Sequence, residues 1–123
     1  MRKNSKKKKG NLGEDLGVEY LKNLNFSILD RNWRYHHWEI DIIAKKDSIL
    51  VFFEIKTREK KSYIEEVSLV SKKQQKTIFK AAAAYMQKIS YSEEFRFDVL
   101  AIILNNTEVK YHHYEDAFFP EWE

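Results

Sequence analysis

The sequence has few of the residues that cross-link or sharply bend a chain: no cysteine, one proline and three glycines among 123 residues. The lack of cysteine excludes disulfide frameworks and thiolate metal sites, and it fits a reducing cytoplasm. No apolar run approaches the roughly 18 residues that a membrane span needs. The basic start, MRKNSKKKKG, is not followed by a hydrophobic segment. We therefore expect a cytoplasmic protein with neither a secretory signal nor a membrane partner.

Positive charge is concentrated at the start of the chain. The net charge is +3, from 22 basic and 19 acidic residues. The first nine positions contain no acidic residue and six basic ones, namely Arg2, Lys3, Lys6, Lys7, Lys8 and Lys9. Such a block is typical of a solvated segment, so we expect a flexible basic arm over residues 1–10 and a single domain over residues 11–123. The arm either only keeps the protein soluble or binds phosphates.

The remaining chain has the hydrophobic pattern of an α/β domain. A hydrophobic content of 43% suits one compact core. Helical periodicity, a capping box from Ser71 to Gln74 and strand-like runs give the following elements. The expected helices span residues 11–25 and 71–89, and the expected strands span 27–35, 39–45, 49–57, 95–104 and 109–114. A charged loop is expected at 58–66. We predict a mixed central β-sheet flanked by helices.

The predicted hairpin in WEIDIIAKKDSILVFFEIK places charged side chains in an otherwise apolar stretch. Its second strand alternates too little to be half-exposed, which indicates a strand covered on both faces, where an unpaired charge is costly. If Asp47 and Ser48 form the turn, Asp41 lies directly opposite Glu54, and Lys56 shares their face. A slip of one residue would send the two carboxylates to opposite faces.

Two interpretations of these charges remain open. Facing carboxylates beside a lysine suit a hard cation such as Mg²⁺, which takes one or two protein carboxylates together with water and substrate phosphates. Such a metal lowers the pKa of a bound water and offsets charge on a scissile phosphate. Lys56 would then position that water or stabilise the developing charge. Alternatively, Lys56 forms solvated surface pairs with Glu39 and Glu54.

Each predicted helix directs one polar residue toward the same region. Glu14 lies at the border of the apolar arc of the first helix, and Gln75 precedes the apolar stripe of the second. The apolar residues that recur at helical spacing in the first helix are Leu12, Leu16, Tyr20, Leu21 and Leu24. Plainer roles are a first-turn acid for Glu14 and a partly exposed residue near the cap for Gln75. The outer side of the second helix carries a basic face that could follow a phosphate backbone, formed by Lys72, Lys73, Lys76 and Lys80.

Other residues allow two interpretations each. His36–His37 and His112–His113 are not expected to bind zinc, because adjacent strand residues point to opposite faces. Asp98 is either a hydrogen-bonded acid or a support for the site. Trp33 is either a core residue or, with Arg34, a ring that stacks on a base. The final AFFPEW segment is either a tail packed on the body or a dimer contact.

Several motifs, in their order and spacing, resemble those of a known family. They are GNLGEDLGVEYL, DRNWR, EIDIIA, LVFFEIKTR, VSKKQQ, RFDVLAI and YEDAF, which run from about residue 10 to residue 118. The sequence resembles the YraN-like family of small bacterial proteins. The fold of that family belongs to the PD-(D/E)XK nucleases and lies close to archaeal Holliday junction resolvases. The resemblance implies a restriction-endonuclease-like core.

The resemblance also implies roles for individual residues. Asp41 looks like the first metal carboxylate, and Glu54 and Lys56 look like the E-x-K half of the nuclease signature. Glu14 looks like the helix-borne acid that supports the metal site, and Gln75 looks like the polar residue that closes it. The expected metal ligands are therefore Asp41, Glu54 and Glu14.

The resemblance has two departures. Ile40 replaces the proline that usually precedes the first aspartate, and Trp38 stands where the family usually has glycine, at the approach to the site. The resemblance still predicts an Mg²⁺- or Mn²⁺-dependent endonuclease that hydrolyses DNA phosphodiester bonds, including branched or processed DNA, as a monomer or homodimer. The expected DNA contacts are Arg58, Lys72, Lys73, Lys76 and Lys80. The alternative is a non-catalytic nucleic-acid-binding or partner-binding module in DNA repair or uptake.

Overall fold

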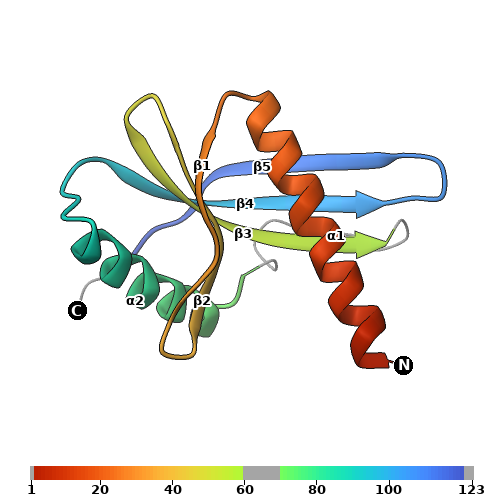
Figure 1. Ribbon diagram of the computed structural model, residues 1–123, viewed down its shortest axis with the longest axis horizontal. Coiled ribbons are helices and arrows are strands. Elements are labelled where there is room, and N and C mark those ends of the chain that lie inside the picture. The colour runs from red at the N-terminus through yellow and green to blue at the C-terminus, as the bar shows by residue number, and fades with distance from the viewer. Residues whose placement is uncertain (1, 60–69, 121–123) are drawn as a thin grey trace.

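Two helices and five strands make up the described part of the chain. The computed structural model describes residues 2–59 and 70–120, with the side chains of 11–59 and 70–120. The elements are α1 (Arg2–Asn23), β1 (Ser27–Tyr35), β2 (Trp38–Lys46), β3 (Ile49–Glu59), α2 (Lys72–Lys88), β4 (Phe95–Leu104) and β5 (Val109–Phe118) (Figure 1). The order of these helices and strands along the chain is the one predicted from the sequence. The part of the expected charged loop from residue 60 onward lies outside the described residues.

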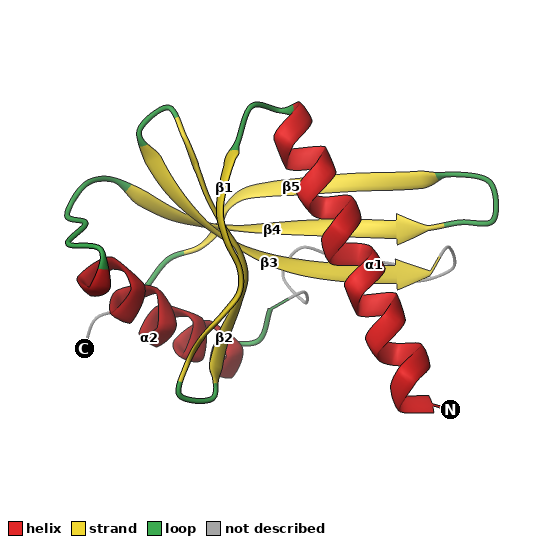
Figure 2. Ribbon diagram, in the orientation of Figure 1, coloured by secondary structure: helices red, strands yellow, loops and turns green. Residues whose placement is uncertain are grey.

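The strands form one mixed sheet in the order β1-β2-β3-β4-β5 (Figure 2). β3 and β4 are parallel, and the other neighbouring pairs are antiparallel. Parallel neighbours need a crossover connection, and α2 lies in the connection between β3 and β4. The predicted α/β architecture is confirmed, and it is compatible with a restriction-endonuclease-like core.

The two helices cover opposite faces of the sheet. Successive residues of β3 alternate between these faces: Phe52 packs in a hydrophobic cluster with α2, and Phe53 packs in a second cluster with α1. Both side chains are buried. This confirms that the apolar strand is covered on both faces. Figure 1 shows α1 crossing the sheet over β3, β4 and β5, while α2 lies beside the β1–β2 hairpin.

α1 packs on the sheet through two glycines. A Cβ atom on Gly13 would lie 2.1 Å from Thr57 Oγ1, and a Cβ atom on Gly17 would lie 3.4 Å from Ile55 Cδ1. The helix backbone therefore lies directly against β3. The buried residues of this helix face are Gly13, Gly17, Val18 and Leu21. The expected leucine-based face is confirmed in part: Leu21 is buried and Leu16 and Tyr20 pack against the same cluster, whereas Leu12 is 49% and Leu24 37% exposed.

The start of α1 differs from the prediction, whereas the start of α2 agrees with it. α1 begins at Arg2 instead of at residue 11, so its backbone is helical through the basic segment. The division of the chain into an arm and a single domain stays a prediction. At α2, the Oγ of the N-cap Ser71 accepts a hydrogen bond from the backbone N–H of Gln74 at 3.1 Å. Neither of the helices described here is long and apolar enough to cross a membrane.

The β2–β3 turn sets the predicted register. Asp47 and Ser48 have φ angles of 51° and 67°, the left-handed conformation that a tight two-residue hairpin turn requires. The ladder that follows pairs the strands in the register predicted from this turn. Asp41 and Glu54 are the residues that follow the last pair of this ladder, Ile42 and Phe53, in the same register.

The end of β5 packs on the body of the protein. The ring of Phe118 stacks on Phe97, with centroids 5.5 Å apart, and also contacts Phe79 of α2 at 5.6 Å. Phe119 is 66% exposed, and residues 121–123 lie outside the described part of the chain. The first part of the AFFPEW segment, expected as a tail, is therefore the end of β5 and packs on the body of the protein.

Candidate active site

β2 and β3 separate beside the predicted site. Their ladder ends at Ile42 and Phe53, and Asp41 belongs to neither of the two ladders that β2 forms. The Asp41 side chain instead reaches across the opening, where its Oδ2 accepts a hydrogen bond from the backbone N–H of Ile55 at 2.8 Å. This bond holds one carboxylate oxygen and leaves Oδ1 without a hydrogen bond to the described residues.

Glu54, Lys56 and Gln74 form a connected polar group. Lys56 Nζ lies 3.1 Å from Glu54 Oε2 and donates to Gln74 Oε1 at 3.3 Å. Gln74 Nε2 donates to the same Glu54 oxygen at 2.7 Å. The side chains of Lys56 and Glu54 are only 17% and 10% exposed, so they are not a solvated surface pair. Glu39, the other expected partner of Lys56, pairs with Arg34 at 3.2 Å.

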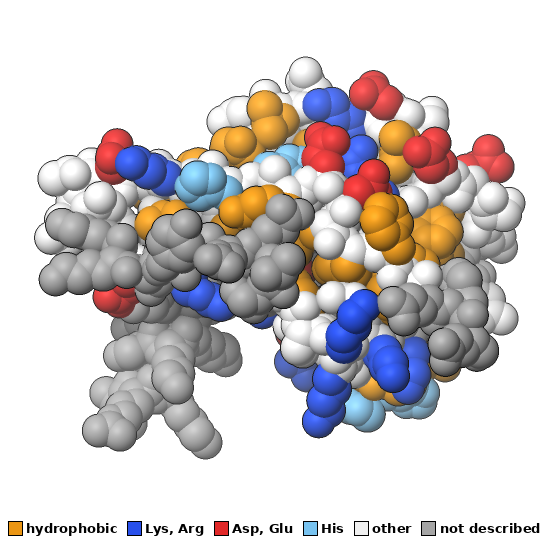
Figure 3. Space-filling model, turned by 180° about the vertical axis from the view of Figure 1, so that it is seen from behind, with side chains coloured by type: hydrophobic (Ala, Val, Ile, Leu, Met, Phe, Trp, Pro, Cys, Tyr) orange, Lys and Arg blue, Asp and Glu red, His pale blue; other side chains and the backbone are white. Residues whose placement is uncertain are grey.

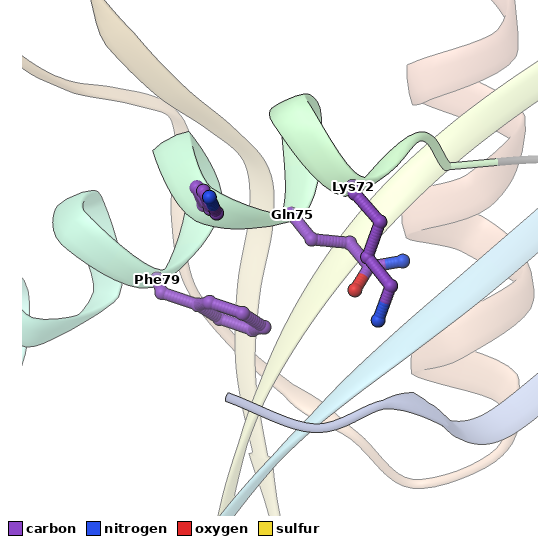
Figure 4. Close-up of a pocket in the computed structure, with 4 residues that line it drawn as sticks. Lys72, Gln75 and Phe79 are labelled. Carbon is purple, nitrogen blue, oxygen red and sulfur yellow. The ribbon is translucent and has the colours of Figure 1, made fainter. Parts of the chain in front are cut away.

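The α2 glutamine at the site is Gln74 and not Gln75. Gln75 Nε2 donates to the backbone oxygen of Val70 at 3.1 Å. Its side chain lines a small separate pocket, whose residues are Lys72, Gln75, Lys76 and Phe79 (Figure 4). The glutamine expected at the site is therefore corrected from Gln75 to Gln74. The two side chains point in directions about 100° apart around the helix axis. Because Ser71 fixes the helix start, Gln74 faces the sheet.

Glu14 adds a third carboxylate from α1. Its side chain is 15% exposed, and its Oε1 is buried with no hydrogen-bond partner among the described residues. Arg31 Nη2 lies 3.8 Å from this oxygen, which is beyond hydrogen-bond distance. Burial raises the pKa of Glu14, while a hydrogen bond from Asn32 and the charge of Arg31 oppose that rise. A buried carboxylate oxygen without a donor is costly, and a bound cation would satisfy it.

The Asp41 carboxyl is surrounded by negative charge. Burial, together with the charges of Glu54, Glu14 and Glu39, raises the pKa of Asp41 to about 8, although the hydrogen bond from Ile55 opposes the rise. Without a cation, the protonated form of Asp41 is therefore favoured more than it is in an exposed aspartate. A cation placed among these groups would favour their ionised forms.

The donor atoms of this region fit a hard divalent cation. Asp41, Glu54 and Glu14 offer only carboxylate oxygens, the ligand type of Mg²⁺ and Mn²⁺. Among the described side chains, no three Asp, Glu or His residues converge closely enough to hold a metal ion as they stand. Mg²⁺ needs only one or two protein carboxylates, because water completes its coordination. A cation bound here would satisfy the Glu14 oxygen that lacks a hydrogen-bond donor and would oppose the raised pKa of Asp41.

The expected DNA-contacting residues lie on α2 and at the end of β3. The exposed lysines of α2, here called the lysine face, are Lys72, Lys73, Lys76 and Lys80. The sequence of α2 contains no acidic residue. Figure 3 shows Lys and Arg side chains grouped over the α2 side of the molecule, with His side chains beside them. Arg58 lies two positions beyond Lys56 on the same face of β3, and its Nη1 donates to Thr57 O at 3.0 Å.

Asp98 belongs to a separate buried network. It is fully buried and accepts hydrogen bonds from Arg96 Nε at 3.0 Å and from the backbone N–H of Asp116 at 3.1 Å. His113 Nε2 lies 2.7 Å from Asp98 Oδ2. The His113 ring packs on Phe53, in the layer between the sheet and α1. Asp98 is therefore a hydrogen-bonded structural acid, and the carboxylates of the candidate site lie elsewhere.

The chain is similar to one protein family over most of its length. The model of "Uncharacterised protein family UPF0102" matches residues 13–102. A UPF0102 protein of Christiangramia forsetii is 40% identical over 110 residues, which cover 89% of this chain and 92% of the relative. A UPF0102 protein of Flavobacterium psychrophilum is 39% identical with the same coverage. A UPF0102 protein of Clostridium botulinum is 39% identical over 104 residues, or 83% of this chain and 85% of the relative.

Proposed function

The chain belongs to the UPF0102 family, also called the YraN family, and from its site we propose that it is a metal-dependent endonuclease that hydrolyses DNA phosphodiester bonds. The observation that carries the proposal is the Glu54–Lys56 pair, 3.1 Å apart and largely buried, close enough to Asp41 for the charge of Glu54 to raise the pKa of that carboxyl. Two carboxylates and one amine, held together and largely buried, have the chemistry that phosphodiester hydrolysis needs.

In this proposal, Asp41 and Glu54 hold an Mg²⁺ or Mn²⁺ ion, and Glu14 supports it from α1. When bound, the metal supplies a water of lowered pKa and offsets negative charge on the scissile phosphate. Asp41 must lose its proton to become a ligand, because only the ionised carboxylate binds a metal well. The hydrogen bond from Ile55 keeps the Asp41 side chain oriented toward β3, so little reorganisation is needed.

Lys56 is the proposed catalytic amine. Glu54 and Gln74 hold its Nζ in place, and an ammonium group so fixed can donate a hydrogen bond to the attacking water or to a phosphate oxygen. That donation stabilises charge that develops during the reaction. Gln74 is a positioning residue, because it contacts both Glu54 and Lys56 and thereby fixes their separation.

The lysine face and Arg58 are proposed to bind DNA phosphates. Exposed lysines without acidic neighbours on the same helix attract a polyanion and make its binding dependent on salt. We further propose that the protein acts in the cytoplasm, as a monomer or a homodimer. The same surface also favours a second function, a DNA-binding module that does not cleave, because binding to the lysine face does not require the buried site.

A cleavage assay tests the proposal. The full chain is incubated with labelled branched, flapped and single-stranded DNA in Mg²⁺, Mn²⁺ or EDTA. We expect cleavage with either metal, none in EDTA and none in Lys56→Ala. A matched control is Lys88→Ala, which removes an exposed lysine at the far end of α2 and should retain cleavage. Cleavage that persists in EDTA or in Lys56→Ala would contradict the site, and binding without cleavage in every metal would favour the non-catalytic module.

A further inference from the structure

The turn between β1 and β2 presents a group of ring side chains at the surface. Four consecutive residues, Tyr35, His36, His37 and Trp38, carry aromatic or imidazole rings. Tyr35 is 42% exposed, both histidines are exposed and Trp38 is half-buried. Together with Trp33 of β1, these residues are here called the aromatic turn. Exposed rings on a small protein are commonly binding surfaces.

Contacts between the rings hold the aromatic turn in shape. Tyr35 stacks on Trp33 with an interplanar angle of 4° and centroids 6.3 Å apart. Its ring centroid also lies 4.3 Å from that of His36 and 5.9 Å from that of Trp38. Trp33 is anchored edge-on against the buried Tyr85 of α2, at 5.2 Å. The turn is therefore preorganised, and binding a flat ligand costs little additional ordering.

The aromatic turn continues into the lysine face. Lys80 Nζ lies 5.0 Å from the centre of the Trp38 ring, a cation–π contact that joins α2 to the turn. Figure 1 shows the same adjacency of α2 and the β1–β2 hairpin. Trp38 precedes Asp41 by three residues on β2, which corresponds to about 10 Å along a strand. Stacking rings and cationic groups are thus direct neighbours, and β2 connects them to Asp41.

We propose that the aromatic turn stacks on unpaired bases of a DNA strand whose phosphates lie along the lysine face. Bases inside a duplex are already stacked on each other and do not expose their faces. Only the bases of an unpaired segment can therefore stack on the rings of the aromatic turn. The charge of the neighbouring surface selects a polyanion. This inference rests on the proposed function and narrows its substrate class to DNA with a single-stranded segment beside the cleaved bond.

Equilibrium binding to two labelled oligonucleotides in EDTA tests the inference. One is a single strand with bases, and the other is a strand of equal length made of abasic sites, which has the same phosphates and no ring to stack. The test variant is the double substitution Tyr35→Ala, His36→Ala in the full chain. We expect it to weaken binding to the first strand about tenfold or more, from the loss of one or more stacked bases. Binding to the abasic strand should change less than twofold.

Two further variants control for the hydroxyl group and for folding. Tyr35→Phe keeps the ring and should bind as the parent does. Tyr111→Ala removes a partly exposed ring on β5, where it stacks on Tyr20, and should leave both affinities unchanged. Thermal melts of each variant confirm that the chain is folded at the binding temperature.

The inference is overturned if the double variant binds both strands as the parent does, or loses affinity equally for both. Neither result affects metal-dependent cleavage, which depends on Lys56. Conversely, absence of cleavage under every metal condition would overturn the proposed nuclease activity. The preference for the strand with bases could still be measured in that case. The two proposals can therefore fail independently.

Discussion

Replacing Asp41 by asparagine tests the candidate site through stability alone. Asp41 has a pKa of about 8 in the folded protein, whereas the ordinary value for an aspartate is 3.8. The folded chain therefore retains a proton that the unfolded chain releases above about pH 4. Asparagine keeps an oxygen that accepts the hydrogen bond from Ile55, and it never ionises. When no cation is bound, the raised pKa of Asp41 lowers the free energy of unfolding of the parent. Asp41→Asn should thus remove this loss of stability.

The size of this cost depends on pH. Between about pH 4 and pH 8 the unfolded state binds fewer protons than the folded state, so the free energy of unfolding of the parent falls by up to about 1.4 kcal/mol per pH unit. This contribution becomes constant above pH 8. At pH 7 the raised pKa of Asp41 lowers the free energy of unfolding of the parent by at most about 4 kcal/mol. We expect Asp41→Asn to gain about 1–3 kcal/mol at pH 7, because local relaxation around the carboxylates lowers the cost, and to gain almost nothing at pH 4.

Mg²⁺ should reverse the order of stability. A ligand that binds only the folded state stabilises it by RT ln(1 + [L]/Kd), and Asp41→Asn has lost one of the proposed ligands. In Mg²⁺ at pH 8 the parent should therefore unfold at the higher denaturant concentration. Urea unfolding from pH 4 to pH 8, with EDTA and with Mg²⁺, measures both effects.

The control is Asp15→Asn on α1. Asp15 is 64% exposed and pairs with Arg31 at 2.6 Å, so its loss should cost about 0.5 kcal/mol at most, with little response to Mg²⁺. A raised pKa of Asp41 in the folded protein is refuted if Asp41→Asn differs from the parent by the same amount at every pH. It is also refuted if the variant is the less stable protein in EDTA.

Two other substitutions test the supporting geometry. Gln74→Ala should lower metal-dependent cleavage about tenfold, because Glu54 and Lys56 lose a shared partner, whereas Gln75→Ala should change it less than twofold; equal effects would contradict the assignment. Gly13→Ala should lower the free energy of unfolding by about 1–3 kcal/mol through the clash with Thr57, and adding Thr57→Ala should restore most of it. A Gly13→Ala chain that is more stable in denaturation would disprove the close approach.

The sequence predicted the hairpin and its register because local rules determine both. A turn at Asp47 and Ser48 allows only one pairing that keeps the apolar residues of both strands buried, and the structure has that pairing. That Asp41 shares a face with Glu54 and Lys56 stays a prediction, because the ladder ends one pair before Asp41 and Glu54. Hydrogen bonds between distant segments were not predictable, so the bond from Ile55 to Asp41 appears only in the structure.

The helices were harder to place because their contacts depend on tertiary packing. In α1, hydrophobic periodicity favoured the leucines, yet the absence of a side chain at Gly13 and Gly17 allows the helix backbone to lie on β3. In α2, Gln74 and Gln75 differ only by a rotation about the helix axis. The capping box from Ser71 to Gln74 was the available signal: it fixes the rotation, and the Gln74 side chain is used at the site instead of at the cap.

During synthesis, β3 leaves the ribosome well before its parallel neighbour. β2 pairs with β3 through a two-residue turn, but β4 follows only after α2. The side chains of the proposed site, from Glu14 to Gln74, are all present by then, while the β3 edge that β4 will cover is still open. Parallel pairing across a crossover is slow, and an uncovered strand edge can pair with other chains. A chain released before β4 would therefore carry every side chain of the proposed site on an incomplete, aggregation-prone sheet.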